Sequence, residues 1–137
     1  MIYHNIESKE DIELFLKETN WLHDGYIIHV SYSHNGITKI EHGHYFEPEK
    51  TKLTIQILVT SIWDAIVEIE FDCLKEWQIR DHQWDIGETS VFIDEKQRVV
   101  WSDQTGTNEE TIKKGSYAIA ETMKWRIVKP ETINCST

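Results

Sequence analysis

The sequence predicts an α+β protein of mainly antiparallel β-sheet. About eight short strands are expected in a sandwich or a curved sheet, with an N-terminal helix packed on one side. Apolar and polar residues alternate with a period of two over most of the chain, and turn signals separate these runs at hairpin spacing. No strand alternates with a long helix, which argues against a doubly wound sheet. A chain of 137 residues can bury one core without a metal or a disulfide, so a single domain is expected over residues 1–137.

The helix is predicted directly after Ser8. This residue is a suitable N-cap, and Asp11 stands three positions later, where an acid completes a capping box. The apolar residues that share one face of the helix are Ile12, Phe15 and Leu16, with Leu14 beside them. Asn20 is expected to end the helix because asparagine tolerates the left-handed conformation.

The strands are expected to follow from residue 26 onward. Residues 26–33 form the first, Asn35 and Gly36 form a tight turn because both accept a positive φ, and residues 37–45 return beside it. The later strands are predicted over residues 53–59, 65–72, 77–79, 91–93, 99–101 and 117–127. A helical turn is predicted over residues 109–114, capped by Asn108 and carrying a Glu110–Lys114 pair.

The charge of the chain restricts its partners. There are 14 Lys and Arg against 24 Asp and Glu, a formal net charge of −10. Nucleic acids and anionic membranes are therefore unfavourable partners, because both bind through cationic side chains. The same charge suits a basic protein partner, although it also serves solubility alone. No cofactor is expected, and a homo-oligomer is compatible with the sequence.

A cytoplasmic location is expected. No apolar run approaches the ~18 residues of a membrane span, and residues 1–9 lack the features of a secretory signal. The two cysteines, Cys73 and Cys135, are too few for a disulfide framework and are expected to be reduced. Cys73 ends an alternating run and is predicted to be a small core residue.

Two tryptophan–aspartate pairs are candidates for binding a partner. Trp63-Asp64 and Trp84-Asp85 lie in predicted loops or strand ends, and an exposed tryptophan beside an acid can anchor a basic partner. Packing over the ends of the sheet is the alternative for Trp63 and Trp84. The tryptophans predicted to pack in the core are Trp77, Trp101 and Trp125.

Three acids in one predicted strand form a second candidate. Alternation places Glu68, Glu70 and Asp72 on one face, where we expect them to face water. They are a solvated sheet face in the simplest interpretation, and a negative patch that steers a basic partner in the functional one. A pair of glycosidase-type carboxylates is a third interpretation, but such a pair needs a concave substrate site, so no catalytic residue is assigned.

A histidine group offers the rival function of a metal-binding or enzymatic β protein. If the tight turn forms, His29 lies opposite His42, with His44 on the same face, and three imidazoles suit Zn or Cu. A wet face of neutral histidines explains the same residues, so no metal site is assigned. A third class is a pocket protein for a small apolar ligand, with a cavity lined by Tyr and Trp.

The adjacent residues His23 and Asp24 are the last motif. This dipeptide occurs in metal-dependent phosphohydrolases, but those sites need further His and Asp on a helical scaffold. The structural interpretation is that the Asp24 side chain accepts backbone N–H groups where a strand begins at Gly25.

The run Trp21-Leu22-His23-Asp24-Gly25-Tyr26-Ile27-Ile28 follows a short helix and leads into the first strand. In this, and in its succession of short strands ending in a long one, the chain resembles small immunity proteins of bacterial polymorphic toxin systems, namely the 50th-type immunity family and its relatives. The likeness covers residues 14–128, with Leu22-His23-Asp24 as its local match. It implies a cytoplasmic antidote that blocks a toxin domain by steric occlusion and is not an enzyme.

Overall fold

The computed structural model describes residues 2–34, 36–41, 43–47, 50–62, 66–80 and 85–129. Its strands are β1 (His4–Asn5), β2 (Gly25–His34), β3 (Ile37–Ile40), β4 (Gly43–Phe46), β5 (Thr51–Val59), β6 (Ile66–Gln78), β7 (Ser90–Ile93), β8 (Val99–Ser102) and β9 (Tyr117–Val128). Its helices are α1 (Lys9–Glu18) and α2 (Glu109–Ile112), and a short turn, η1 (Asn20–Leu22), follows α1.

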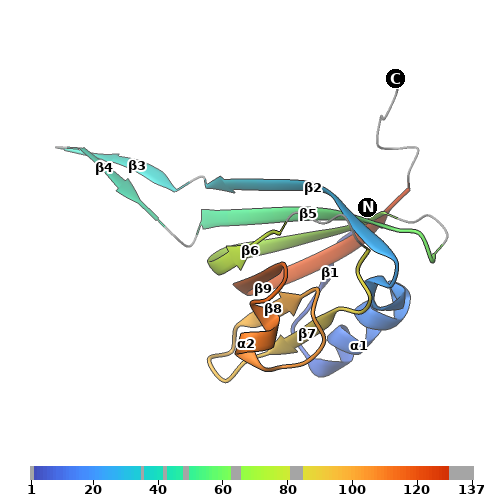
Figure 1. Cartoon of the computed structure of the whole chain (residues 1–137). Helices are drawn as coiled ribbons and strands as arrows, with labels where there is room; N and C mark the ends of the chain where they lie inside the picture. The colour runs from blue at the N-terminus through green and yellow to red at the C-terminus, as the bar shows by residue number, and fades with distance from the viewer. Residues whose placement is uncertain are drawn as a thin grey trace.

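Seven of these strands form one antiparallel sheet, and six of them follow the order β2-β5-β6-β9-β8-β7. The short strand β1 pairs with the part of β9 that β8 leaves free. The sheet is open and curved. Helix α1 lies near β1 and β7 (Figure 1). The predicted class, α+β with mainly antiparallel sheet, is confirmed in its curved form.

Helix α1 begins as predicted and covers the core. Ser8 Oγ accepts a hydrogen bond from Asp11 N at 3.2 Å, and the Asp11 carboxylate accepts one from Ser8 N at 3.1 Å, which completes the capping box. Phe15 is fully buried, and its ring packs in a T-shaped arrangement against the Trp125 ring at a centroid distance of 5.3 Å. Leu14 stays exposed, because it points away from the face that packs on the sheet.

The core lies between α1 and one face of the sheet. Its largest contributors from the central strands are Leu53, Ile55, Ile57, Val67, Ile69, Phe71, Met123 and Trp125. Trp101 and Trp125 are buried as predicted, but Trp77 is 37% exposed and the core prediction for it is wrong. The reason is that β6 continues beyond the last residue of β5 with which it pairs, so that among the described strands only β9 lies beside Trp77.

Strand β6 is one long element where two were predicted. It runs from Ile66 to Gln78, and the expected break is a bulge at which the pairing with β9 shifts between Leu74 and Glu76. Cys73, just before this shift, has φ 57° and is buried, which confirms it as a small core residue.

The predicted hairpin between residues 26–33 and 37–45 is wrong. Strand β2 pairs with β5, whereas β3 and β4 pair with each other and form a separate two-stranded arm that extends beyond the end of β2 (Figure 1). Strand β5 is buried at every second position, whereas the predicted register would set Lys39 and Glu41 on the apolar face of β2. Asn35 lies outside the described residues.

The second helix is short, and Asn108 caps it as predicted by accepting hydrogen bonds from Glu110 N and Thr111 N. The ion pair along it joins Glu109 to Lys113 at 2.7 Å, one residue earlier than the predicted pair. The helix covers the outer face of the β7–β9 region through a small second cluster, Val100, Ile112, Tyr117 and Ile119 with Phe92.

Candidate partner-binding site

A left-handed turn, residues 20–24, connects α1 to β2, and we call it the tryptophan turn because it contains Trp21. Asn20, Trp21 and Leu22 have φ values of 53°, 55° and 54°, and Asp24 follows with φ 61°. Left-handed backbone costs a non-glycine residue about 1–2 kcal/mol, and it persists only where the surroundings hold it. Leu22 is fully buried, so the core holds the turn from one side.

Two distant segments hold the backbone of the turn. Thr89 N donates to the Trp21 carbonyl at 3.1 Å, and Asp24 N donates to the Ile86 carbonyl at 2.9 Å. Thr60 donates to the Asp24 carbonyl through its N–H at 3.3 Å and through its hydroxyl at 3.0 Å. The turn is therefore fixed between the residues after β5 and the residues before β7.

Side chains add a second set of ties. Asn20 Nδ2 donates to Ser61 Oγ at 3.1 Å, and Ser61 Oγ donates to the His23 carbonyl at 2.7 Å. The His23 ring lies across the turn, with Nδ1 2.6 Å from the carbonyl oxygen of Gly87. Because a carbonyl only accepts, Nδ1 is the protonated nitrogen. These bonds make the turn rigid even though much of it is at the surface.

The rigid turn presents Trp21 to solvent, with 44% of the residue exposed. A tryptophan that is fixed in place and still half-exposed is the type of residue that anchors a protein interface. Trp21 is not among the residues that the sequence predicts to bind a partner. The sequence signal that indicates Trp21 is Asn20. If Asn20 ends the helix in the left-handed conformation, one of the next two apolar residues, Trp21 or Leu22, has to face solvent.

Carboxylates surround this tryptophan turn. The Asp24 carboxylate lies 3.6 Å from His23 Nε2, and both side chains are about half exposed. The backbone of Asp24 is hydrogen-bonded as described, whereas its carboxylate faces the imidazole, which differs from the predicted role of binding backbone N–H groups. Asp85 and Glu88 are exposed on the neighbouring segment.

The carboxylates around the turn change the pKa of His23. The hydrogen bond to the Gly87 carbonyl raises this pKa above its usual value, and the negative charges of Asp24, Asp85 and Glu88 raise it further. The three carboxylates thus act on one imidazole, so the local field is negative.

The acids of β6 differ from the exposed carboxylates at the turn, because they are largely covered by neighbouring side chains. Glu68 and Glu70 are buried, only 7% and 8% exposed, and Asp72 is half-buried, so the expectation that these acids face water is wrong. Glu68 accepts hydrogen bonds from the Tyr3 hydroxyl at 2.5 Å, from Gln56 Nε2 at 2.9 Å and from Arg126 Nε at 2.6 Å. Burial opposes ionisation, but these donors hold the pKa of Glu68 below its usual value.

Glu70, the next acid of the row, is also paired. Glu70 lies 3.3 Å from Lys52 Nζ and 2.7 Å from Lys124 Nζ. Burial, followed by the charge of Glu70, raises the pKa of Asp72. The cations Lys52, Lys124 and Arg126 therefore balance the three acids, and the outer face of β6 contributes little net negative field.

Three of the residues predicted to bind a partner, Trp63, Asp64 and Trp84, lie outside the described residues. Asp85 is described and exposed, and it belongs to the negative surface at the turn. The structure therefore places Asp85 near His23, in the turn that carries Trp21, and not with the acids of β6.

The histidine group is not assembled as predicted. His29 lies on β2 opposite Gln56, and His44 lies on β4 opposite Lys39 in the separate arm. His42 is outside the described residues. Within the part of the chain that the structure describes, no three His, Cys, Asp or Glu side chains could hold a metal ion together.

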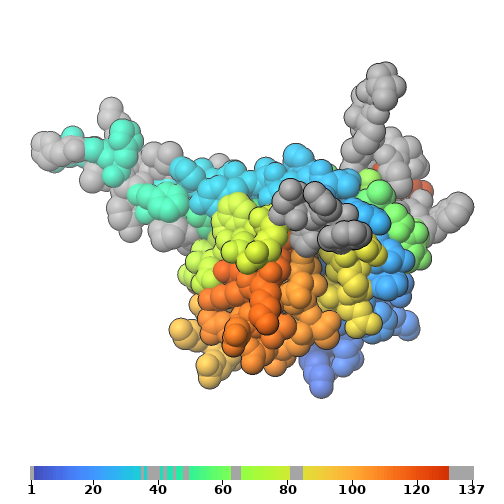
Figure 2. All heavy atoms as spheres, viewed as in Figure 1, coloured from blue at the N-terminus to red at the C-terminus, as the bar shows by residue number. Residues whose placement is uncertain are grey.

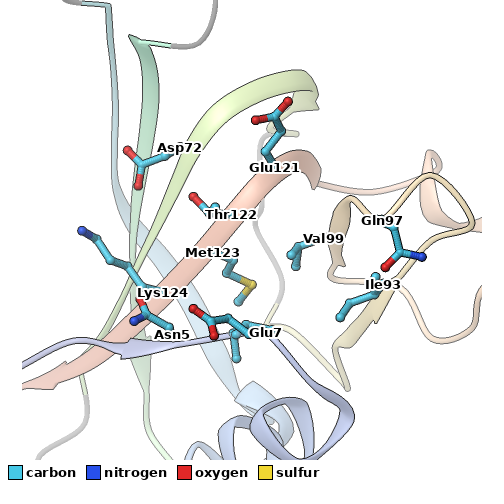
Figure 3. Close-up of a pocket in the computed structure, with 11 residues that line it drawn as sticks. Asn5, Glu7, Asp72, Ile93, Gln97, Val99, Glu121, Thr122, Met123 and Lys124 are labelled. Carbon is cyan, nitrogen blue, oxygen red and sulfur yellow. The ribbon is translucent and has the colours of Figure 1, made fainter.

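A cleft of about 370 Å³ opens beside β9, between the ends of β1 and β8 (Figure 3). It is lined by Asn5, Ile6, Glu7, Asp72, Ile93, Gln97, Val99, Glu121, Thr122, Met123 and Lys124. None of these described residues is Tyr or Trp, and several are charged. The cleft thus differs from the aromatic pocket predicted for a protein that binds a small apolar ligand.

Fold and site define a small acidic protein of mainly antiparallel sheet that carries a rigid tryptophan turn on its surface. Comparisons with models of known families, with curated proteins and with solved structures each found no match. No helix among the described residues has the length and apolar character needed to cross a membrane.

Proposed function

We propose that this protein is a small cytoplasmic binding protein, specifically an immunity protein that blocks a basic toxin domain by steric occlusion. The observation that carries this proposal is Trp21, a half-exposed tryptophan fixed on a left-handed turn. The resemblance at residues 21–28 falls on the same turn.

The backbone of the turn favours a binding role for Trp21. Strained backbone that is held by many contacts is a feature of sites that must keep one geometry. Because the turn is already ordered, a partner that covers Trp21 does not have to immobilise it, and the entropic cost of binding is reduced. Trp21 is therefore the proposed anchor of the interface.

The charge around the anchor defines the partner. Asp24, Asp85 and Glu88 surround the turn, and the net charge of the chain is −10. A basic partner is attracted to this surface and meets the anchor in the correct orientation. The acids of β6 are a weaker choice for this role, because cations on the same face balance them.

The first experiment identifies the partner. Tagged protein is used to capture binding proteins from an extract of its own host at low and moderate salt, and mass spectrometry identifies them. One stoichiometric, basic protein that salt releases is the expected result. The purified partner should also lose its own toxic activity when the complex forms, since occlusion blocks its active site.

Kinetic measurements with that partner then test the site. Trp21→Ala should weaken binding by about 30-fold or more, mainly through faster dissociation. A charge reversal of Asp85 and Glu88 to Lys should slow association and reduce its salt dependence. Trp77→Ala is the matched control, because Trp77 is also exposed but lies at the other end of the sheet. Unchanged affinity of Trp21→Ala would overturn the proposal.

A further inference from the structure

The two edges of the main sheet differ in length and protection. Strand β7 at one edge has four residues, whereas β2 at the other has ten. Figure 2 shows β2, in blue, along the upper rim of the molecule. Among the described residues, the partner on the outer side of β2 is Ile86, which is bridged to Gly25 at the start of the strand. A long edge of this kind offers backbone N–H and C=O groups to another strand.

The composition of β2 leaves this edge unprotected. Natural proteins usually place charged residues or proline on edge strands to prevent pairing between molecules. Residues 25–34 contain no Asp, Glu, Lys, Arg or Pro, in a chain of which 28% is charged. Instead the strand exposes Tyr26, Ile28 and Tyr32 by 41–44% each. Apart from the bridge to Ile86, the protective feature that the described residues show is a bulge between Ile27 and His29, which leaves residues 29–34 in regular pairing with β5.

We propose that β2 pairs antiparallel with β2 of a second copy of this chain, which joins the two sheets into one. Two copies repel each other because each carries a charge of −10, and the uncharged edge is where their approach costs least. A basic partner such as the one proposed above gains no charge complementarity from this strand. The edge therefore fits a copy of itself better than that partner.

The alternation of side chains supports a two-fold axis at Ser31. Val30 and Tyr32 lie on the same face of β2, because they pair with Ile55 and Leu53, which both belong to the core. An axis at Ser31 sets Val30 of each copy opposite Tyr32 of the other. A β-branched residue opposite an aromatic one is a favourable cross-strand pair. Only the small Ser31 side chains meet at the axis, and the Trp21 turn lies outside the paired segment.

Light scattering and sedimentation of the full chain test the proposal. The expected species has twice the 16.2 kDa mass of the chain, and its dissociation constant falls as salt screens the repulsion. Ser31→Lys and Ser31→Glu should each weaken the dimer at least about tenfold, because like charges then face each other at the axis. An equimolar mixture of the two variants should recover a heterodimer.

Thr107→Lys is the control, because it makes the same charge change at an exposed residue outside the sheet edge. It should leave the dimer intact, and circular dichroism should show that all variants keep their sheet. A wild-type chain that is monomeric up to about 1 mM would overturn the proposal. So would a dimer that tolerates both Ser31 variants, or a mixture that does not recover. Toxin binding by Ser31→Lys should stay normal, which separates this proposal from the previous one.

Discussion

His23 Nδ1 lies 2.6 Å from the carbonyl oxygen of Gly87, a residue 64 positions later in the chain. This bond ties the turn after α1 to the segment that precedes β7, and it leaves Nε2 of the same ring directed toward Asp24. The imidazole is thus hydrogen-bonded on one side and faces a carboxylate on the other. This environment favours the protonated ring.

The pKa of His23 is expected to exceed the ordinary histidine value of about 6.5. An NMR titration of the imidazole signals measures it directly. Asp85→Asn and Glu88→Gln should each lower the value toward 6.5, since each removes a negative charge that favours the imidazolium ion. Glu95→Gln, in the remote β7–β8 turn, is the control and should leave it unchanged. A wild-type pKa below 6.5 would contradict the described geometry.

Glycine should be the better small replacement for Trp21. At φ 55° an alanine keeps the left-handed strain, whereas glycine relieves it, so Trp21→Gly should be about 1 kcal/mol more stable than Trp21→Ala. Urea unfolding measures the difference. The same pair at Leu14, an equally exposed residue within α1, should show the opposite order, with alanine about 1 kcal/mol more stable. Equal stabilities at position 21 would argue against strain there.

Gly25→Ala is expected to destabilise the fold by about 1–3 kcal/mol. A Cβ atom on Gly25 would lie 2.7 Å from the Leu22 carbonyl oxygen and 2.9 Å from Cγ2 of Ile57, so the turn and β5 would have to move apart. Gly87→Ala is the matched control, because its Cβ meets nothing within 4 Å, and it should be neutral or stabilising by up to about 1 kcal/mol. Thermal and urea unfolding compare the two variants.

Glu68→Gln should destabilise the protein by about 1–3 kcal/mol at pH 7, since the side chain of Arg126 loses its charged partner. The pKa of Glu68 is lowered on folding, so its contribution is present above the unfolded pKa of about 4.3 and is lost as pH falls through the folded value. The difference from wild type should therefore shrink at pH 3. Urea unfolding at both pH values tests this.

Glu95→Gln is a suitable control for that series, because Glu95 is exposed in a turn and should change stability by less than about 0.5 kcal/mol. An equal loss for Glu68→Gln at pH 3 and pH 7 would show that its effect comes from packing and not from ionisation.

Much of the fold could be predicted because its signals are local. The capping box of Ser8 and Asp11 and the cap at Asn108 depend on residues within one helical turn. The alternation in β5 likewise reports which face of the strand is buried. Such patterns predict the elements and the fold class without any knowledge of their neighbours.

The pairing of the strands could not be predicted in the same way. Asn35-Gly36 favours a hairpin locally, but β2 pairs with β5, which offers a continuous apolar row. The balance of charge on β6 also depends on pairing, since Lys52 and Lys124 reach Glu70 from the strands on either side. The alternation along β6 predicts that Glu70 lies on the face opposite the core. It does not predict which side chains of the neighbouring strands cover that face.

The sequence by itself determined the class of this protein: a mainly antiparallel sheet with one capped helix and a strong negative charge, because periodicity, caps and composition need no long-range contact. Only the tertiary structure decided which tryptophan is the anchor. Trp21 and Leu22 are adjacent apolar residues, and contacts with Thr60, Ile86 and Thr89 hold the backbone left-handed, which buries Leu22 and exposes Trp21. Those contacts join segments about 40 to 70 residues apart, where no local pattern can report them.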